Sequence, residues 1–184
     1  MTSEQAPGRI PEVVRSEVVH RGYPFDVTVD TLRVEGGREV VRSIARHPGA
    51  IALVALDDDG RWLLVRQYRH PARRWLLEIP AGTLEVGEAP EATAARELRE
   101  ETGFAAAQLE RLGGTWMAPG FCTEYITYFL ATGLRPDPLP HDDDEAFAPL
   151  EHLTRAEMAA AVAHSEIEDA KTLVAMQLMA LRSS

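Results

Sequence analysis

The sequence gathers carboxylates in a short segment that is typical of the last turns of a helix. Glu97, Glu100 and Glu101 follow Arg96 and precede Gly103. On a helix, Glu97 and Glu101 lie one above the other, with Glu100 beside them. At an effective dielectric constant of about 20, two carboxylates roughly 6 Å apart repel each other by roughly 2.8 kcal/mol. A divalent cation with oxygen ligands turns that repulsion into attraction, so the spacing favours a Mg²⁺ or Mn²⁺ site, with a solvated acidic face as the alternative.

The helix that carries these carboxylates is predicted from its two ends and one apolar stripe. Pro90 suits a first turn, and Gly103 suits the residue that follows the last turn. Ala94, Ala95 and Leu98 form a stripe that can pack on a sheet. We therefore expect one face of the helix to be buried and another to present the carboxylates after a glycine-containing loop.

Strands and helices around this segment are predicted from apolar runs, alternation and helical spacing. A continuous apolar run and the segment that returns after it are expected to form a central hairpin, followed by a short strand that leads into the glycine loop. Two further strands, the first weakened or bulged at Gly113 and Gly114, precede two closing helices. In chain order the ranges are 50–56, 62–69, 75–82, 109–116, 126–131, 154–164 and 168–182.

The N-terminal part reads as a separate layer. Residues 1–12 are polar with Pro and Gly and suit a flexible arm. Residues 13–47 alternate between apolar and polar side chains around a Gly-Gly turn, which predicts a small antiparallel sheet. Tyr23 and Phe25 in this region are expected to lie in a core or an interface. Residues 48–184 then form the main domain.

Composition limits the class of protein. The chain has 184 residues, is 45% hydrophobic and carries a formal net charge of -10, so one globular domain is expected and a nucleic-acid polymer is an unfavourable partner. No signal segment or membrane span is expected. The lone cysteine, Cys122, is interpreted as a buried thiol in a reducing, cytoplasmic setting. Lys171 is the only lysine, which we interpret as a bias of composition.

Candidate binding residues precede the glycine loop. Arg66 and Arg69 end the second strand of the expected hairpin, and a guanidinium such as that of Arg69 matches phosphate oxygens bidentately. Glu78 stands in an apolar run, where a carboxylate needs a partner or a function. We expect Glu78 to hold substrate or an arginine.

The spacing of the acidic segment and its loop resembles a family signature. The pattern G-x5-E-x7-R-E-U-x-E-E-x-G-U, with U hydrophobic, resembles the Nudix box of hydrolases that cleave nucleoside diphosphates linked to another group. Segments 66–69, 76–82 and 119–120 look like the ADP-ribose pyrophosphatase branch of that family. The positions that match the pattern are Gly82, Glu88, Arg96, Glu97, Leu98, Glu100, Glu101, Gly103 and Phe104.

The resemblance implies a fold and a set of roles. The fold would be an α/β/α sandwich with a mixed sheet, and the small N-terminal sheet would help to form a homodimer. The acidic loop 142–145 would supply a general base, with Glu145 considered first and Asp144 next, although the sequence leaves the choice among its four acids open. The other implied roles are metal ligation by Glu97, Glu100, Glu101 and the carbonyl of Ala81, orientation of the carboxylates by Arg96, support of the loop by Glu88, and substrate binding by Arg66, Arg69, Glu78, Pro119, Gly120 and Glu124.

The implied reaction is metal-dependent hydrolysis of ADP-ribose to AMP and ribose 5-phosphate. A water deprotonated by a carboxylate would attack one phosphorus, with Mg²⁺ or Mn²⁺ neutralising the phosphate charge. One alternative is another small nucleoside diphosphate derivative, such as NADH, GDP-mannose or a flavin dinucleotide. A second alternative is a module that binds ADP-ribose without cleaving it.

Overall fold

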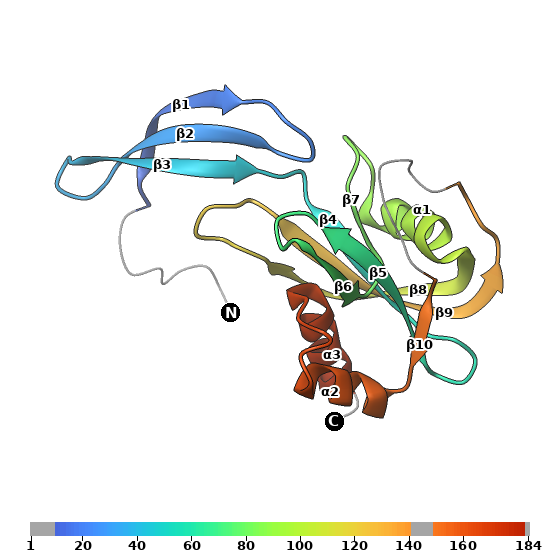
Figure 1. Ribbon diagram of the computed structural model, residues 1–184. Coiled ribbons are helices and arrows are strands. Elements are labelled where there is room, and N and C mark those ends of the chain that lie inside the picture. The colour runs from blue at the N-terminus through green and yellow to red at the C-terminus, as the bar shows by residue number, and fades with distance from the viewer. Residues whose placement is uncertain (1–9, 141–148, 183–184) are drawn as a thin grey trace. The chain divides into compact units, whose positions relative to one another are not determined.

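The structure, a computed structural model, describes residues 10–140 and 149–182 and divides into two compact units (Figure 1). Most of the arm predicted for residues 1–12 therefore lies outside the described residues. The first unit comprises the chain up to Pro48 together with Ala118–Glu124, and the second comprises Gly49–Met117 and the chain from Tyr125 onward.

The first unit is an antiparallel sheet in the order β1-β2-β3, as the alternating sequence predicts. The turn between β2 and β3 uses Gly36 and Gly37 at φ of 83° and 80°, which few other residues adopt. Ala45 binds the loop of the same unit, accepting from Thr123 N at 3.0 Å and donating to Phe121 O at 2.8 Å. The strands are β1 (Glu12–His20), β2 (Asp26–Arg33) and β3 (Glu39–Arg46).

Two aromatic residues of the first unit are not in its core. Tyr23 is 90% exposed and Phe25 is 40% exposed. The core position considered for them is therefore wrong within this chain, and an interface position stays a prediction. Cys122 is only partly buried, which corrects its interpretation as a fully buried thiol.

The second unit contains two sheets. The first is mixed, in the order β7-β4-β9-β8, with β4 parallel to β9 and the other pairs antiparallel. The second is antiparallel, in the order β10-β5-β6. The strands are β4 (Ala50–Ala55), β5 (Trp62–Arg69), β6 (Arg74–Glu78), β7 (Ala81–Thr83), β8 (Phe104–Trp116), β9 (Tyr125–Pro136) and β10 (Glu151–Leu153).

The expected central hairpin is wrong, because β4 and β5 enter different sheets. Beyond the turn they share only the isolated bridge between Leu56 and Trp62, and β4 instead pairs with β7 on one edge and β9 on the other. The single strand expected at 75–82 is also divided, into β6 and β7. Pro80 has no N–H for a ladder, and its carbonyl accepts from Leu53 N at 2.8 Å. The irregularity expected in β8 is confirmed by a register shift between Arg111 and Gly113.

Three helices complete the second unit: α1 (Pro90–Thr102), α2 (Arg155–Ala163) and α3 (Ala170–Arg182), all close to the predicted ranges. Gly103 ends α1 in the left-handed conformation at φ 76°, as predicted. Thr154 caps α2 through a reciprocal hydrogen-bonded box with Glu157. Among these described helices, none is long and apolar enough to cross a membrane.

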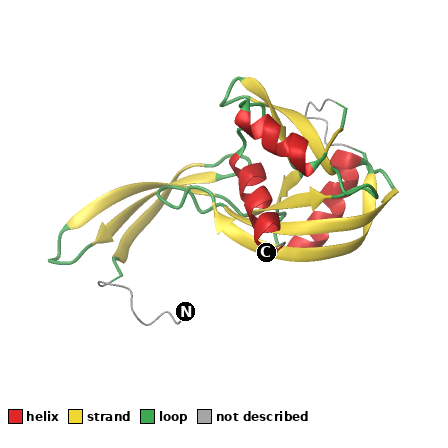
Figure 2. Cartoon of the chain, turned by 90° about the horizontal axis from the view of Figure 1, so that it is seen from below, coloured by secondary structure: helices red, strands yellow, loops and turns green. Residues whose placement is uncertain are grey.

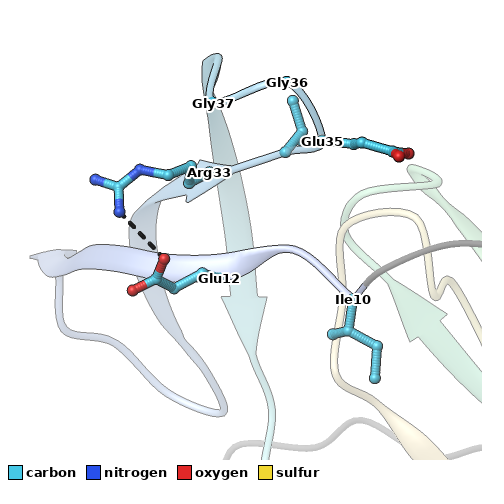
Figure 3. A pocket seen from close by; sticks show the side chains of 7 residues that line it. Ile10, Glu12, Arg33, Glu35, Gly36 and Gly37 are labelled. Carbon is cyan, nitrogen blue, oxygen red and sulfur yellow. Dashed lines mark hydrogen bonds and ion pairs between the residues drawn. The ribbon is translucent and has the colours of Figure 1, made fainter.

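Strand β4 forms the centre of the core, because its alternate residues enter two different hydrophobic clusters. Ile51, Leu53 and Ala55 pack with Leu98 of α1, whereas the cluster of Ala50, Ala52 and Val54 includes Met158 of α2 and Ala175 of α3. The helices therefore cover opposite faces of the mixed sheet, as Figure 2 shows from a second direction. This confirms the α/β/α sandwich with a mixed sheet.

Candidate active site

Helix α1 places its carboxylates by burying its apolar stripe. Ala94 and Leu98 have no exposed surface and belong to the hydrophobic cluster between α1 and the mixed sheet. Ala95 is exposed, so the third residue of the predicted stripe is wrong. Burial of this face fixes the rotation of the helix, and the carboxylates emerge beside strand β7.

Arg96 binds one carboxylate at the end of the glycine loop and two on α1. Its Nη1 donates to Glu97 Oε1 at 2.8 Å and to Glu100 Oε2 at 2.7 Å. Its Nε and Nη2 donate to the two oxygens of Glu88 at 3.3 and 3.2 Å. One guanidinium thus faces three carboxylates, which leaves the cluster negatively charged, and the orienting role of Arg96 stays a prediction.

The same contacts shift two pKa values. Burial alone would lower the pKa of Arg96, but the hydrogen bond to Glu88 and the charges of Glu97 and Glu100 raise it overall. The pKa of Glu88 is lowered, chiefly by its hydrogen bond from Arg96. Both groups are therefore held in their charged forms at neutral pH.

Strand β7 approaches the carboxylates through its backbone. Ala81 N donates to Glu101 Oε2 at 2.9 Å, and the Glu101 residue is only 7% exposed. Next to it, Gly82 lies so close to Glu97 that a Cβ at this position would overlap the Glu97 side chain. The glycine of the loop is therefore required by space, because only bare backbone fits against the carboxylate.

The donor set suits a hard divalent cation. Glu97, Glu100 and Glu101 offer carboxylate oxygens from one helix surface, and such oxygens are the ligands that Mg²⁺ and Mn²⁺ take. Within residues 10–140 and 149–182, no three acidic, His or Cys side chains converge in a ready ligand arrangement. One oxygen of Glu97 and one oxygen of Glu100 accept from Arg96 instead.

The arginines expected to bind phosphate are held by carboxylates. Arg69 Nε and Nη2 donate to Glu78 Oε1 and Oε2 at 2.9 and 2.8 Å, and Glu78 is completely buried. Arg66 Nε donates to Glu151 Oε1 at 2.6 Å. Glu78 therefore does hold an arginine, and both arginine side chains are partly exposed, Arg66 by 36% and Arg69 by 38%.

Lys171, which composition alone did not mark as a site residue, belongs to the support of Glu78. It is a buried side chain whose Nζ contacts Glu78 and lies 3.1 Å from Asp169 Oδ1. Burial, followed by the positive charge of Arg69, lowers its pKa well below the usual value. A signal was present, because Lys171 stands four residues before Ala175 on the buried face of α3.

The remaining expected site residues belong to the first unit or lie outside the described residues. Pro119, Gly120 and Glu124 belong to the loop of the first unit, whereas α1 belongs to the second. In the first unit, burial lowers the pKa of His47, and the negative charge of Glu124 opposes this shift. Glu145 and Asp144 lie outside the described residues. Roles for these residues in the site stay predictions.

Within an α/β/α sandwich, the edge strand β7 thus lies beside three glutamates of α1 whose carboxylate oxygens suit a divalent cation. The model of the NUDIX domain matches residues 45–171 of the sequence. This match covers more than half of the chain, which therefore belongs to the Nudix family of hydrolases.

Comparisons with individual proteins agree with this assignment. The chain is 37% identical over 175 residues to the ADP-ribose pyrophosphatase of Bacillus subtilis (strain 168), covering 94% of each chain. It is 48% identical over 125 residues to the ADP-ribose pyrophosphatase of Mycobacterium tuberculosis, covering 67% of this chain and 60% of that protein. A crystal structure described as an ADP compounds hydrolase superposes with a TM-score of 0.82 at 26% identity, covering 95% of both chains.

Proposed function

We propose that this protein hydrolyses the pyrophosphate of ADP-ribose to AMP and ribose 5-phosphate, using Mg²⁺ or Mn²⁺. The observation that carries the proposal is the carboxylate cluster of α1 against the bare backbone of Ala81 and Gly82. The substrate is supported by the Bacillus subtilis relative, which is named for this activity and aligns over almost the whole chain.

In this proposal each residue of the cluster has a separate task. Glu97, Glu100 and Glu101 would hold the divalent cation, which on binding supplies charge neutralisation for the pyrophosphate and acidifies water. Arg96 orients Glu97 and Glu100, and the amide of Ala81 orients Glu101.

Substrate contacts are assigned to the groups outside α1. Arg69 and Arg66 would bind phosphate oxygens, because their side chains are partly exposed and a guanidinium can bond two acceptors at once. Glu145, with Asp144 next, would accept the proton of the attacking water. The other proposed substrate contacts are Glu78, Pro119, Gly120 and Glu124.

The assembly and location stay proposals as well. We propose a cytoplasmic homodimer in which the sheet of the first unit takes part. Several apolar side chains of β1 and β3 are exposed and would lose contact with water in such an interface: Val13, Val14, Val18, Val19 and Val41. Light scattering after size-exclusion chromatography tests the dimer, and a monomeric mass at micromolar concentration would oppose it.

Product analysis tests the proposed function. The purified protein is incubated with ADP-ribose, NADH, GDP-mannose or flavin dinucleotide, each with Mg²⁺, with Mn²⁺ and with chelator. The expected result is AMP released from ADP-ribose in the presence of metal and none with chelator. Faster cleavage of another compound would make that compound the proposed substrate while leaving pyrophosphate hydrolysis as the proposed reaction. Tight binding of ADP-ribose without cleavage would favour a sensing module.

A further inference from the structure

Four consecutive residues connect the end of β6 to the start of β7, and each is held by a different group. The Glu78 carboxylate contacts Lys171, and Ile79 N donates to Thr172 Oγ1 at 3.0 Å. Pro80 O accepts from β4, and Ala81 N donates to Glu101. The first two are therefore fixed by α3, and the fourth contacts Glu101, a candidate metal ligand.

The contacts from α3 are themselves oriented by one carboxylate. Asp169 Oδ2 accepts from Thr172 N at 2.8 Å and from Thr172 Oγ1 at 2.6 Å, while Asp169 Oδ1 lies 3.1 Å from Lys171 Nζ. The Thr172 hydroxyl therefore donates to Asp169 and accepts from Ile79 at the same time. Since Thr172 has no exposed surface, water cannot replace either bond.

We propose that Thr172 and Lys171 are positioning residues for the metal site, holding residues 78–81 so that the Ala81 amide and Gly82 keep Glu101 and Glu97 in place. They touch neither metal nor substrate in this proposal. The inference rests on the proposed use of α1 as a metal site, but it does not depend on which nucleotide is cleaved.

The test compares Thr172→Val with Thr172→Ser. Valine keeps the shape of threonine but leaves the buried Ile79 N–H without an acceptor, whereas serine keeps the hydroxyl. Mn²⁺ binding is measured by electron paramagnetic resonance, without substrate, alongside Tm in chelator. We expect Thr172→Val to weaken Mn²⁺ binding roughly tenfold, as loss of an outer-layer partner typically does, and Thr172→Ser to restore most of the affinity.

A second variant separates positioning from general destabilisation. Ala175→Gly weakens α3 at a buried position of the same helix and removes none of the side-chain hydrogen bonds from α3 to Glu78 and Ile79. It should lower Tm but leave Mn²⁺ affinity within twofold of the wild type. Lys171→Met should act like Thr172→Val wherever the variant folds.

The outcomes are distinct. Equal Mn²⁺ affinity in Thr172→Val and the wild type would overturn the proposal, as would a loss in Ala175→Gly as large as that in Thr172→Val. A wild type that binds Mn²⁺ but does not cleave ADP-ribose would contradict the proposed function while leaving this inference to be decided by the variants. Absence of Mn²⁺ binding in the wild type would contradict both.

Discussion

Gly82 and Glu97 are packed so closely that the glycine has no space for a methyl group. The side-chain atoms that a Cβ would meet include the carboxylate end of Glu97, which can rotate away. Substitution here should therefore move a proposed metal ligand more than it disturbs the core.

We expect Gly82→Ala to lower metal-dependent turnover roughly 10- to 100-fold, a range typical for displaced partners of metal ligands. Its Tm should stay close to the wild-type value, because Glu97 can yield. Turnover and thermal unfolding are measured on the same preparation, with Thr83→Ala on the same strand as control. Unchanged turnover in Gly82→Ala would show that the position of Glu97 does not matter.

Glu97→Gln and Glu101→Gln should each reduce turnover by orders of magnitude while preserving the fold. Glutamine keeps the shape but loses the negative charge that a divalent cation needs. Turnover at several metal concentrations and circular dichroism provide the measurement. Glu91→Gln, at an exposed position in the first turn of α1, is the matched control. Near-normal activity in Glu101→Gln would exclude it as a ligand.

Arg96→Gln should lower the free energy of unfolding by about 1–3 kcal/mol in chelator, because it leaves three partly buried carboxylates without their shared donor. The measurement is urea unfolding followed by fluorescence. Arg99→Gln serves as control, since Arg99 lies on the same helix but bonds Asp137. We expect Arg99→Gln to lower the free energy of unfolding by less. Equal losses in the two variants would show that the contacts of Arg96 with three carboxylates add no particular stability.

The contact between Asp57 and His152 predicts that the stability of the fold depends on pH in the acidic range. The hydrogen bond to His152 is the largest cause that lowers the pKa of Asp57, to about 2. A carboxylate whose pKa is lower in the folded than in the unfolded state stabilises the fold at any pH above its unfolded-state pKa. This stabilisation is lost as the pH falls through the folded-state pKa.

Asp57→Asn should therefore lower Tm at about pH 5, and its difference from the wild type should narrow as the pH falls from about 4 to about 2. Calorimetry across this range, with the exposed Asp58→Asn as control, measures the difference. A gap that widens on acidification would mean that Asp57 does not stabilise the fold through its charge.

The sequence was sufficient for the parts of the site that depend on neighbours along the chain. Pro90 and Gly103 mark the ends of α1 by local conformational preference, and the four-residue spacing of Glu97 and Glu101 follows from helical geometry. These predictions required no knowledge of the sheet, so the helix and its acidic surface were found.

The errors arose where distant segments meet. Nothing local shows that both edges of β4 are taken by β7 and β9, which is why the expected hairpin with β5 is wrong. Likewise, the partner of Lys171 is Glu78, 93 residues away in the chain. In the sequence, Lys171 and Glu78 are two unrelated charged residues among apolar neighbours, and only the fold shows that they form a pair.

The burial of β4 on both faces has a consequence for local motion in the site. Ile51 and Ala52 pair directly with Gly82 and Ala81, and Leu53 N bonds Pro80 O. Core strands open with free energies close to that of global unfolding. We therefore expect β4 to open only when the second unit unfolds, so that the β4 backbone to which residues 80–83 are bonded stays in place for as long as that unit is folded.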